Sequence, residues 1–180
     1  MTATDFTANY FELFQLPVSF EVDLNALSER YRSLQSSIHP DKFANAGDLE
    51  RRLSVQQSAR INDAFQTLKN PLRRARYLLQ LNGIDLDADI DTRMDSQFLM
   101  RQMEFRESLE AVKSSANPAE RVKAINADID ASIDDIIQKL KKLFTGGLAQ
   151  DLTTARDFVR RLQFMIRLQE EAQDLEESLY

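Results

Sequence analysis

The sequence predicts an all-α fold in two modules: an N-terminal antiparallel helical hairpin with short flanking helices, and a C-terminal antiparallel three-helix bundle. Only 4 of the 180 residues are glycine and 4 are proline, and the prolines fall where helices would begin or end. Apolar residues recur at spacings of three and four over long stretches, whereas strand patterns are almost absent. The modules also differ in charge, since residues 1–83 hold 10 basic and 9 acidic groups and residues 84–180 hold 13 and 20.

The first half of the N-terminal module, residues 1–83, should hold two helices. A short one ends before Pro17 and is built on the apolar residues Tyr10, Leu13 and Phe14. Asp23 can cap the second helix, and we expect Arg30 and Arg32 to face water from it. The apolar stripe of this helix recurs at threes and fours and consists of Leu24, Leu27, Tyr31, Leu34 and Ile38.

The second half of this module should hold two more helices. Asp48 is the predicted cap of the third helix, whose inward residues are Ile61, Ala64, Phe65 and Leu68. Asn70 is the predicted cap of the fourth helix, with Pro71 at its first position. Asn82-Gly83 should end this helix, because glycine is favoured just past a helix C-terminus.

Residues 84–94 are predicted to be a solvated linker. Their alternating aspartates resemble the start of a calcium-binding loop. The pattern fails, however, because Ile90 stands where the loop needs glycine and Ser96 where it needs a glutamate. We therefore expect no metal here.

Three longer helices are expected in residues 95–180. The first runs from Asp95-Ser96 to about Ser115. The second begins at Asn117-Pro118, with Glu120 completing the cap, and ends at Gly146-Gly147; its stripe is Val122, Ile125, Ile129, Ile133, Ile136, Leu140 and Leu143. The third runs from about Asp151 to the C-terminus with the stripe Phe158, Leu162, Met165, Leu168, Ala172, Leu175 and Leu179. Short connections favour an antiparallel bundle.

Composition excludes several classes of function. The chain has no cysteine and one histidine, so disulfides, thiolate ligands and multi-histidine metal sites are excluded, and we expect no cofactor. The N-terminus lacks a basic and apolar leader, and no apolar run reaches the length of a membrane span. We therefore expect a cytoplasmic protein without membrane contact. The acidic second module argues against nucleic-acid binding.

The only histidine lies in a polar segment between the second and third helices. Pro40 disfavours helical geometry at His39, so the imidazole of His39-Pro40-Asp41 should be presented outward on a turn. A histidine beside a proline is also a common helix terminator with no further role. The segment gains interest from the helices on either side of it.

The helix of residues 96–115 has more apolar residues than its core stripe requires. At about 100° per residue, that stripe consists of Phe98, Phe105, Leu109 and Val112. A second apolar face holds Leu99, Met100 and Met103, interleaved with Glu104 and Glu107. Either the helix is buried on two sides, or this face binds another protein; unpartnered glutamates argue against burial. Phe164, off the stripe of the last helix, would extend this face if the two helices pack side by side.

These residues resemble known families. The segment Tyr10–Gly83 resembles a J-domain through Arg30-Tyr31-Arg32, His39-Pro40-Asp41 and Ile61-Asn62-Asp63-Ala64-Phe65. Nearly the whole chain is similar to the HscB family, the J-type co-chaperones of iron–sulfur cluster assembly. The narrower likeness rests on His39-Pro40-Asp41-Lys42-Phe43, Gln56-Gln57-Ser58-Ala59, Phe98-Leu99-Met100 and Met103-Glu104-Phe105-Arg106-Glu107.

The resemblance implies two protein partners and no catalysis on this chain. The first module would bind the DnaK-type chaperone HscA and stimulate its ATPase through Tyr31, Arg32, His39, Pro40, Asp41 and Lys42. The second would bind the scaffold protein IscU through Leu99, Met100, Met103, Glu104, Glu107 and Phe164. One position departs from the family pattern, because Ala111 stands where members often carry an acid.

Two alternatives stay open at this point. The chain could be a J-domain co-chaperone for a different client protein. It could also be a small helical enzyme that uses Arg160, Arg161 and Glu104 around a pocket, although no nucleophile with an adjacent base can be named.

Overall fold

The computed structural model describes residues 8–38, 47–84, 86, 96–146 and 149–179. Contacts divide the chain into two compact units, Met1–Leu78 and Leu79–Tyr180, which are described separately. The elements are α1 (Tyr10–Leu13), α2 (Leu24–Ile38), α3 (Asp48–Lys69), α4 (Pro71–Leu81), α5 (Ser96–Glu110), α6 (Pro118–Gly146) and α7 (Ala149–Glu177). The predicted all-α fold is confirmed. No helix in these described stretches is both long and apolar enough to cross a membrane.

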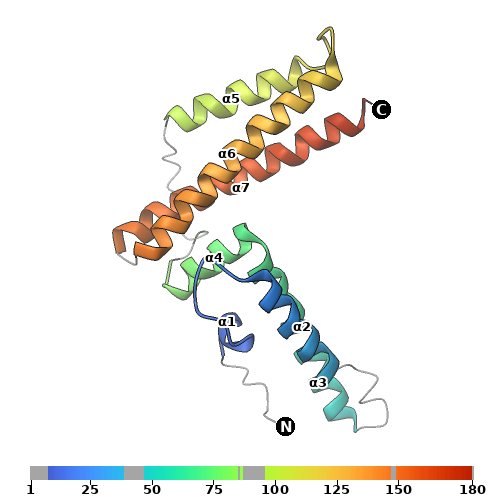
Figure 1. Cartoon of the computed structure of the whole chain (residues 1–180), viewed down its shortest axis with the longest axis vertical. Helices are drawn as coiled ribbons and strands as arrows, with labels where there is room; N and C mark the ends of the chain where they lie inside the picture. The colour runs from blue at the N-terminus through green and yellow to red at the C-terminus, as the bar shows by residue number, and fades with distance from the viewer. Residues whose placement is uncertain (1–7, 39–46, 85, 87–95, 147–148, 180) are drawn as a thin grey trace. The chain divides into compact units, whose positions relative to one another are not determined.

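The first unit is built on the hairpin of α2 and α3, which lie side by side (Figure 1). Its core is formed by residues of α1, α2 and α3 that have lost all or nearly all solvent contact, namely Phe11, Phe14, Leu27, Ile61, Ala64 and Leu68. Leu24 was expected in this core but is 47% exposed, because it is the first residue of α2. Phe11, absent from the predicted stripe of α1, is fully buried.

Side chains cap the helices of this unit as predicted at two of three positions. The Asp23 carboxylate accepts hydrogen bonds from the backbone N–H of Asn25 and Ala26, at 2.9 and 3.0 Å. Asn70 Oδ1 accepts one from the N–H of Arg73 at 3.0 Å. Both predicted caps are thus confirmed.

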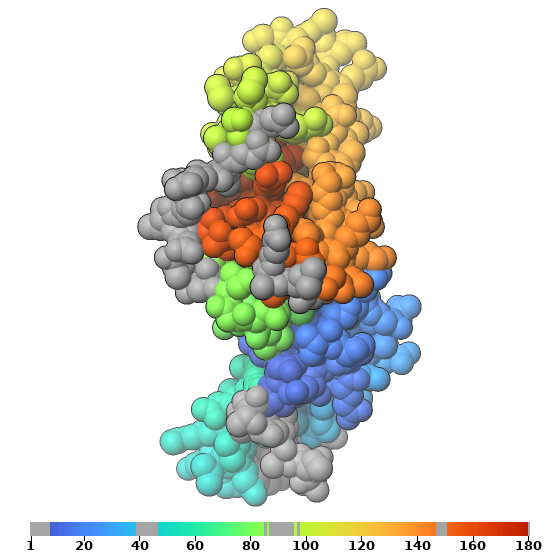
Figure 2. Space-filling view, turned by 90° about the vertical axis from the view of Figure 1, so that its left-hand side faces the viewer, coloured from blue at the N-terminus to red at the C-terminus, as the bar shows by residue number. Residues whose placement is uncertain are grey.

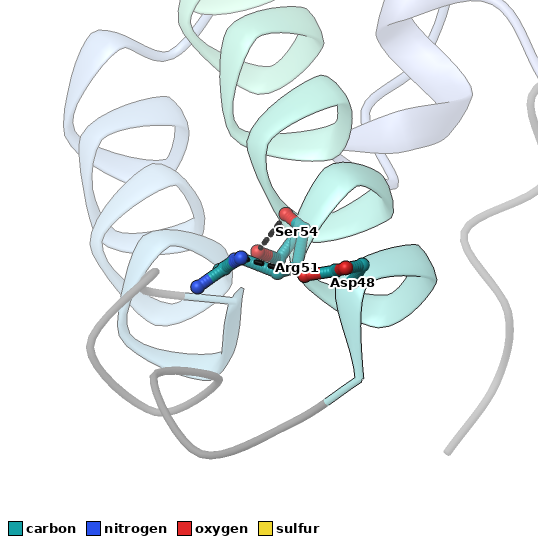
Figure 3. Close-up of polar contacts among 3 residues, drawn as sticks. All are labelled: Asp48, Arg51 and Ser54. Atoms are coloured by element: carbon teal, nitrogen blue, oxygen red, sulfur yellow. Dashed lines mark hydrogen bonds and ion pairs between the residues drawn. The ribbon is translucent and has the colours of Figure 1, made fainter.

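The predicted cap at Asp48 is wrong. Gly47 occupies the cap position and makes no side-chain hydrogen bond, while Asp48 is the first residue of α3. Its carboxylate instead pairs with Arg51 at 2.7 Å, and the Ser54 hydroxyl donates to the Arg51 carbonyl at 2.9 Å (Figure 3). Asp48 therefore contributes negative charge to the first turn, where the helix dipole favours it.

Arg30 does not face water as expected. Its guanidinium donates hydrogen bonds to the backbone carbonyls of Phe14 and Gln15. Gln15 has a positive φ of 51°, so the chain after α1 turns in a way that presents these carbonyls to α2. Arg30 thus ties the α1–α2 loop to the hairpin, whereas Arg32 is exposed.

The two ends of the first unit meet at a pair of tyrosines. The rings of Tyr10 and Tyr77 stack with centroids 4.4 Å apart, and the Tyr10 N–H donates to the Tyr77 hydroxyl at 2.9 Å. The Tyr10 hydroxyl donates to Asp63 at 2.6 Å. Burial, this hydrogen bond and the charge of Asp63 raise the pKa of Tyr10 to about 12. Burial also raises the pKa of Tyr77.

The fourth helix ends at Asn82-Gly83 as predicted. Gly83 has a φ of +75°, which a residue with a Cβ rarely adopts. The N–H of Ile84 bonds the Leu79 carbonyl at 2.9 Å, and that of Gly83 bonds the Gln80 carbonyl at 3.0 Å. These two bonds are the Schellman pattern that satisfies the last carbonyls of a helix.

In the second unit, α6 and α7 form a long antiparallel pair and α5 packs alongside both (Figure 1). From α5 onward its buried residues are Phe105, Leu109, Val112, Val122, Ile125, Ile129, Ile133, Ile136, Leu140, Ala155, Val159, Leu162, Met165, Leu168 and Ala172. Two kinds of expectation need correction. The helix α5 ends at Glu110 rather than near Ser115. Five residues of the predicted core stripes are only half-buried, namely Phe98, Leu143, Phe158, Leu175 and Leu179. Ala155 and Val159 carry the first turns of the α7 stripe instead.

Candidate partner-binding surfaces

The predicted chaperone-binding residues lie partly beyond the described part of the chain. His39, Pro40, Asp41 and Lys42 all fall within residues 39–46, which are outside it. The structure describes the hairpin on either side of them. Tyr31 and Arg32 are both on α2, and their surroundings define the described portion of this surface.

Tyr31 is held across the hairpin by α3. Its ring stacks on Phe65 with centroids 4.1 Å apart, and its hydroxyl donates to Asn62 Oδ1 at 2.8 Å. The same Asn62 oxygen accepts from Gln35 Nε2 at 2.5 Å, and Ser58 donates to Gln35 at 3.3 Å. Tyr31 is therefore a fixed, half-buried residue, while Arg32 beside it extends into solvent.

This polar network was not predicted. Helix periodicity predicts that Ile61, Ala64 and Phe65 face inward, but it predicts no partner for Asn62 or Gln35. A helical wheel shows which residues share one face of a helix, but not which residue of a neighbouring helix lies opposite. The pairing of Tyr31 with Asn62 therefore needs the register between α2 and α3.

The second apolar face of α5 is open to solvent. Leu99 is 43% exposed, Met100 63% and Met103 62%, and α5 lies at the surface of the second unit (Figure 2). Burial on two sides is thus excluded for this helix. We call Leu99, Met100, Met103, Glu104 and Glu107 the α5 face.

Acidic side chains lie among the apolar residues of the α5 face. Glu104 and Glu107 are exposed, and neither carboxylate forms a hydrogen bond or ion pair with another described residue. An exposed apolar cluster with a charged rim is typical of a protein-binding surface, and methionine adapts its shape to a partner. The face combines adaptable apolar contact with two carboxylates free to accept charged donors.

Phe164 of α7 borders the α5 face. Its ring meets that of Phe98 edge to face, with centroids 6.0 Å apart, and the Arg106 guanidinium lies 5.5 Å from its centroid. Residues three apart are neighbours on a helix surface, so Arg106 lies next to Met103. The predicted site residues of the two helices are therefore brought to adjoining positions.

A groove runs between α5 and α6 on another flank of α5. It has a volume of about 340 Å³ and is lined by Phe98, Arg101, Asp128, Ala131, Ser132, Asp135, Ile136 and Met165. Neither Glu104 nor the pair Arg160 and Arg161 lines this groove. No group of three or more possible metal ligands occurs among the described residues.

Known proteins resemble this chain over nearly its whole length. It is 48% identical over 172 residues to a co-chaperone protein HscB homolog of Shewanella halifaxensis, covering 96% of this chain and 99% of that one. A homolog of Shewanella pealeana is 47% identical, covering 95% and 98%. Residues 94–173 match the family described as the HSCB C-terminal oligomerisation domain.

Solved structures of co-chaperones also resemble this chain. The chaperone HscB from Vibrio cholerae has a TM-score of 0.86 at 42% identity, covering 96% of this chain and 100% of that one. The human co-chaperone HscB has a TM-score of 0.86 at 32% identity, covering 95% and 83%. A J-domain followed by a C-terminal helical bundle is the architecture of both. Since the identity extends over both units, and the predicted resemblance is thereby confirmed, the chain belongs to the HscB family of co-chaperones.

Proposed function

We propose that this protein is a J-type co-chaperone of iron–sulfur cluster assembly that stimulates the ATPase of HscA and delivers the scaffold protein IscU to it. The observation that carries the proposal is the α5 face, an exposed apolar surface in a unit separate from the J-domain. The protein would then bind two partners in the cytoplasm through two surfaces. We assign residues 1–83 to the J-domain, 84–94 to a linker and 95–180 to scaffold binding.

The chaperone surface is assigned to α2 and the segment that follows it. Family likeness points to His39, Pro40, Asp41 and Lys42, together with Tyr31 and Arg32. A carboxylate such as that of Asp41 can accept charge-assisted hydrogen bonds from a partner arginine, and Arg32 can pair with a partner carboxylate. Support from the hairpin comes through Tyr31, whose hydroxyl and ring are both held by α3.

The scaffold surface is assigned to the α5 face with Phe164. Leu99, Met100 and Met103 offer apolar area, and each CH₂ group that a partner buries contributes about 0.8 kcal/mol. Glu104 and Glu107 would orient a partner that presents basic groups. Phe164 supplies an aromatic side chain, a type enriched among residues that dominate binding energy.

The proposed mechanism is linkage between binding sites, without a chemical step on this chain. A J-domain that binds one conformation of the chaperone better than another shifts the chaperone toward that conformation. Such coupling free energies are typically about 1–3 kcal/mol. Because the two surfaces belong to one chain, binding of the scaffold raises its concentration near the chaperone.

The experiment that tests the proposal is an HscA ATPase assay with and without IscU. Wild-type protein should stimulate hydrolysis, and IscU should add synergistically. Asp41→Asn should abolish the stimulation while the helical circular dichroism stays native. Equal ATPase rates with wild-type protein and Asp41→Asn would refute the assignment of the loop.

A second variant tests the scaffold surface. The combined change Leu99→Ala, Met103→Ala and Phe164→Ala should weaken IscU binding at least tenfold, about 1.4 kcal/mol, in calorimetric titration. Leu81→Ala is the matched control. The exposed fraction of Leu81, 41%, is similar to the 43% of Leu99, but Leu81 lies outside α5. Wild-type affinity for IscU in the triple variant would remove the α5 face from the proposal. If the wild-type protein binds a different client and not IscU, the alternative of a co-chaperone for another client is favoured.

A further inference from the structure

The two halves of α5 are attached to the bundle differently. Phe105 and Leu109, each 8% exposed, are buried in its second half, and the fully buried Val112 lies just beyond its end. The first half carries Leu99 and Met100, which are exposed, and among its described side chains none is buried. The half that presents the apolar residues is thus less deeply packed into the core than the other half, and Phe98 is its half-buried apolar side chain.

A cluster of aromatic and cationic side chains connects the first half of α5 to α7. The Arg161 guanidinium lies between two rings, 5.3 Å from the centroid of Phe98 and 5.0 Å from that of Phe158. Phe98 also meets Phe164 edge to face at 6.0 Å. Arg106 lies 5.5 Å from the Phe164 centroid. We call Phe98, Arg106, Phe158, Arg161 and Phe164 the Arg161 cluster.

The geometry explains why an arginine stands at position 161. A guanidinium is planar and weakly hydrated, so it stacks on aromatic faces more readily than a lysine ammonium does. A cation within about 6 Å of a ring centroid is attracted by the negative face of the ring. Arg161 meets this condition for rings of both α5 and α7, and so it joins the two helices.

Phe164 belongs to the Arg161 cluster and also borders the α5 face. Any shift of Phe98 away from α7 would therefore separate Phe164 from Leu99 and Met103. Leu99 follows Phe98 directly in the chain, so the position of one fixes that of the other.

We infer that Arg161 is a positioning residue, which by stacking between Phe98 and Phe158 holds the first half of α5 against α7 so that Leu99, Met103 and Phe164 form one continuous binding surface. The binding role of that surface rests on the function proposed above. The positioning itself concerns the free protein and can be tested without a partner.

The first test is amide hydrogen exchange of the free protein. Arg161→Ala should speed exchange in residues 96–104 at least about fivefold, because local opening becomes more frequent when contacts are lost. Exchange in the central turns of α6 should stay unchanged. Arg167→Ala, an exposed arginine of α7 outside the cluster, is the matched control. Should Arg161→Ala lower the helical circular dichroism, Arg161→Met, which keeps the aliphatic stem, takes its place. Wild-type exchange in residues 96–104 would overturn the inference.

The second test is calorimetric titration with IscU. Arg161→Ala should weaken binding about tenfold, the equivalent of 1.4 kcal/mol, and Arg161→Lys should weaken it nearly as much, because lysine stacks poorly. In a Phe98→Ala background, Arg161→Ala should have little further effect, since both changes remove one shared contact. Two results would overturn the inference in favour of a direct charge contact with the partner. One is full affinity for IscU in Arg161→Lys. The other is a loss of affinity in Arg161→Ala that disappears at high salt.

The two tests separate this inference from the proposed function. If the wild-type protein fails to bind IscU, the proposed function fails and hydrogen exchange alone decides whether Arg161 positions α5. If the triple variant of the surface loses IscU but Arg161→Ala changes neither exchange nor affinity, the function stands and the positioning role is overturned.

Discussion

The Tyr31 hydroxyl donates a 2.8 Å hydrogen bond to Asn62 Oδ1 and so joins the two long helices of the J-domain. The same oxygen accepts a hydrogen bond from Gln35. One amide oxygen therefore serves two donors from α2. The orientation of Tyr31, a residue assigned to the chaperone surface, depends on an α3 side chain.

We expect Asn62→Ala to lower the free energy of unfolding by about 1 kcal/mol, because two hydrogen-bonded donors lose their acceptor. Urea unfolding followed by circular dichroism measures this loss. Asn62→Asp keeps an acceptor oxygen at the same place and should retain most of the stability. Equal destabilisation by both changes would show that the shared acceptor is not what stabilises the hairpin.

The two aspartates near the starts of α2 and α3 should respond differently to the same substitution. Asp23→Ala removes a side-chain cap with two hydrogen bonds and should cost about 1 kcal/mol. Asp48→Ala removes an exposed ion pair and should cost less than about 0.5 kcal/mol. Thermal unfolding of the two variants side by side provides the comparison, and a larger cost at Asp48 would contradict it.

Gly83→Ala should destabilise the protein by about 1–2 kcal/mol, because a Cβ at positive φ crowds the backbone. The φ of +75° at this position leads us to expect strain even though no atom beyond the two adjacent residues lies within 4 Å of the added Cβ. Gly83→Asn should cost less, since asparagine tolerates this conformation. The test is urea unfolding of both variants, and equal stability of Gly83→Ala and wild type would rule out the strain.

Alkaline pH should weaken the first unit through Tyr10. Its pKa rises from the ordinary 10.0 to about 12 in the folded protein, so folding favours the protonated phenol. This contribution is fully present below pH 10 and is lost as the pH rises toward 12. The raised pKa of Tyr77 acts in the same direction.

The measurement is urea unfolding at several values from pH 9 to pH 12. Tyr10→Phe should make the decline of stability with pH shallower than in the wild type, and Tyr31→Phe, which removes a phenol elsewhere in the hairpin, is the control. An identical decline in wild type and Tyr10→Phe would exclude Tyr10 as a source of the pH dependence.

Much of the fold is predictable from the sequence because helix periodicity reports which side of a helix is buried. The α6 stripe from Val122 to Leu140 is buried as predicted, and the caps at Asp23 and Asn70 depend only on neighbouring residues. Some errors are local, such as the predicted cap at Asp48, but others involve residues far apart in the sequence. Arg30 bonds carbonyls 15 and 16 residues away, and no local pattern identifies such a partner.

The candidate site likewise has features that one helix alone predicts and features that depend on how two helices pack. A second apolar face with Leu99, Met100 and Met103 was predictable, because a single wheel shows more apolar residues on α5 than one core face needs. Its exposure was one of two open alternatives, which the glutamates favoured. The contacts of Arg161 were not, since they depend on how α5 and α7 are aligned. For Asp41 and its neighbours, the assignment still rests on family likeness.

The stacked pair of Tyr10 and Tyr77 also bears on when the first unit can finish folding during synthesis. With four residues, α1 is far too short to persist as an isolated helix in water. Tyr77, on which Tyr10 stacks, leaves the ribosome 67 residues later. Until then Phe11 and Phe14, among the most deeply buried side chains of the mature protein, lack part of their final environment. The ring contacts of Tyr10 and Phe11 with Tyr77 can therefore form only after this part of α4 has been synthesised.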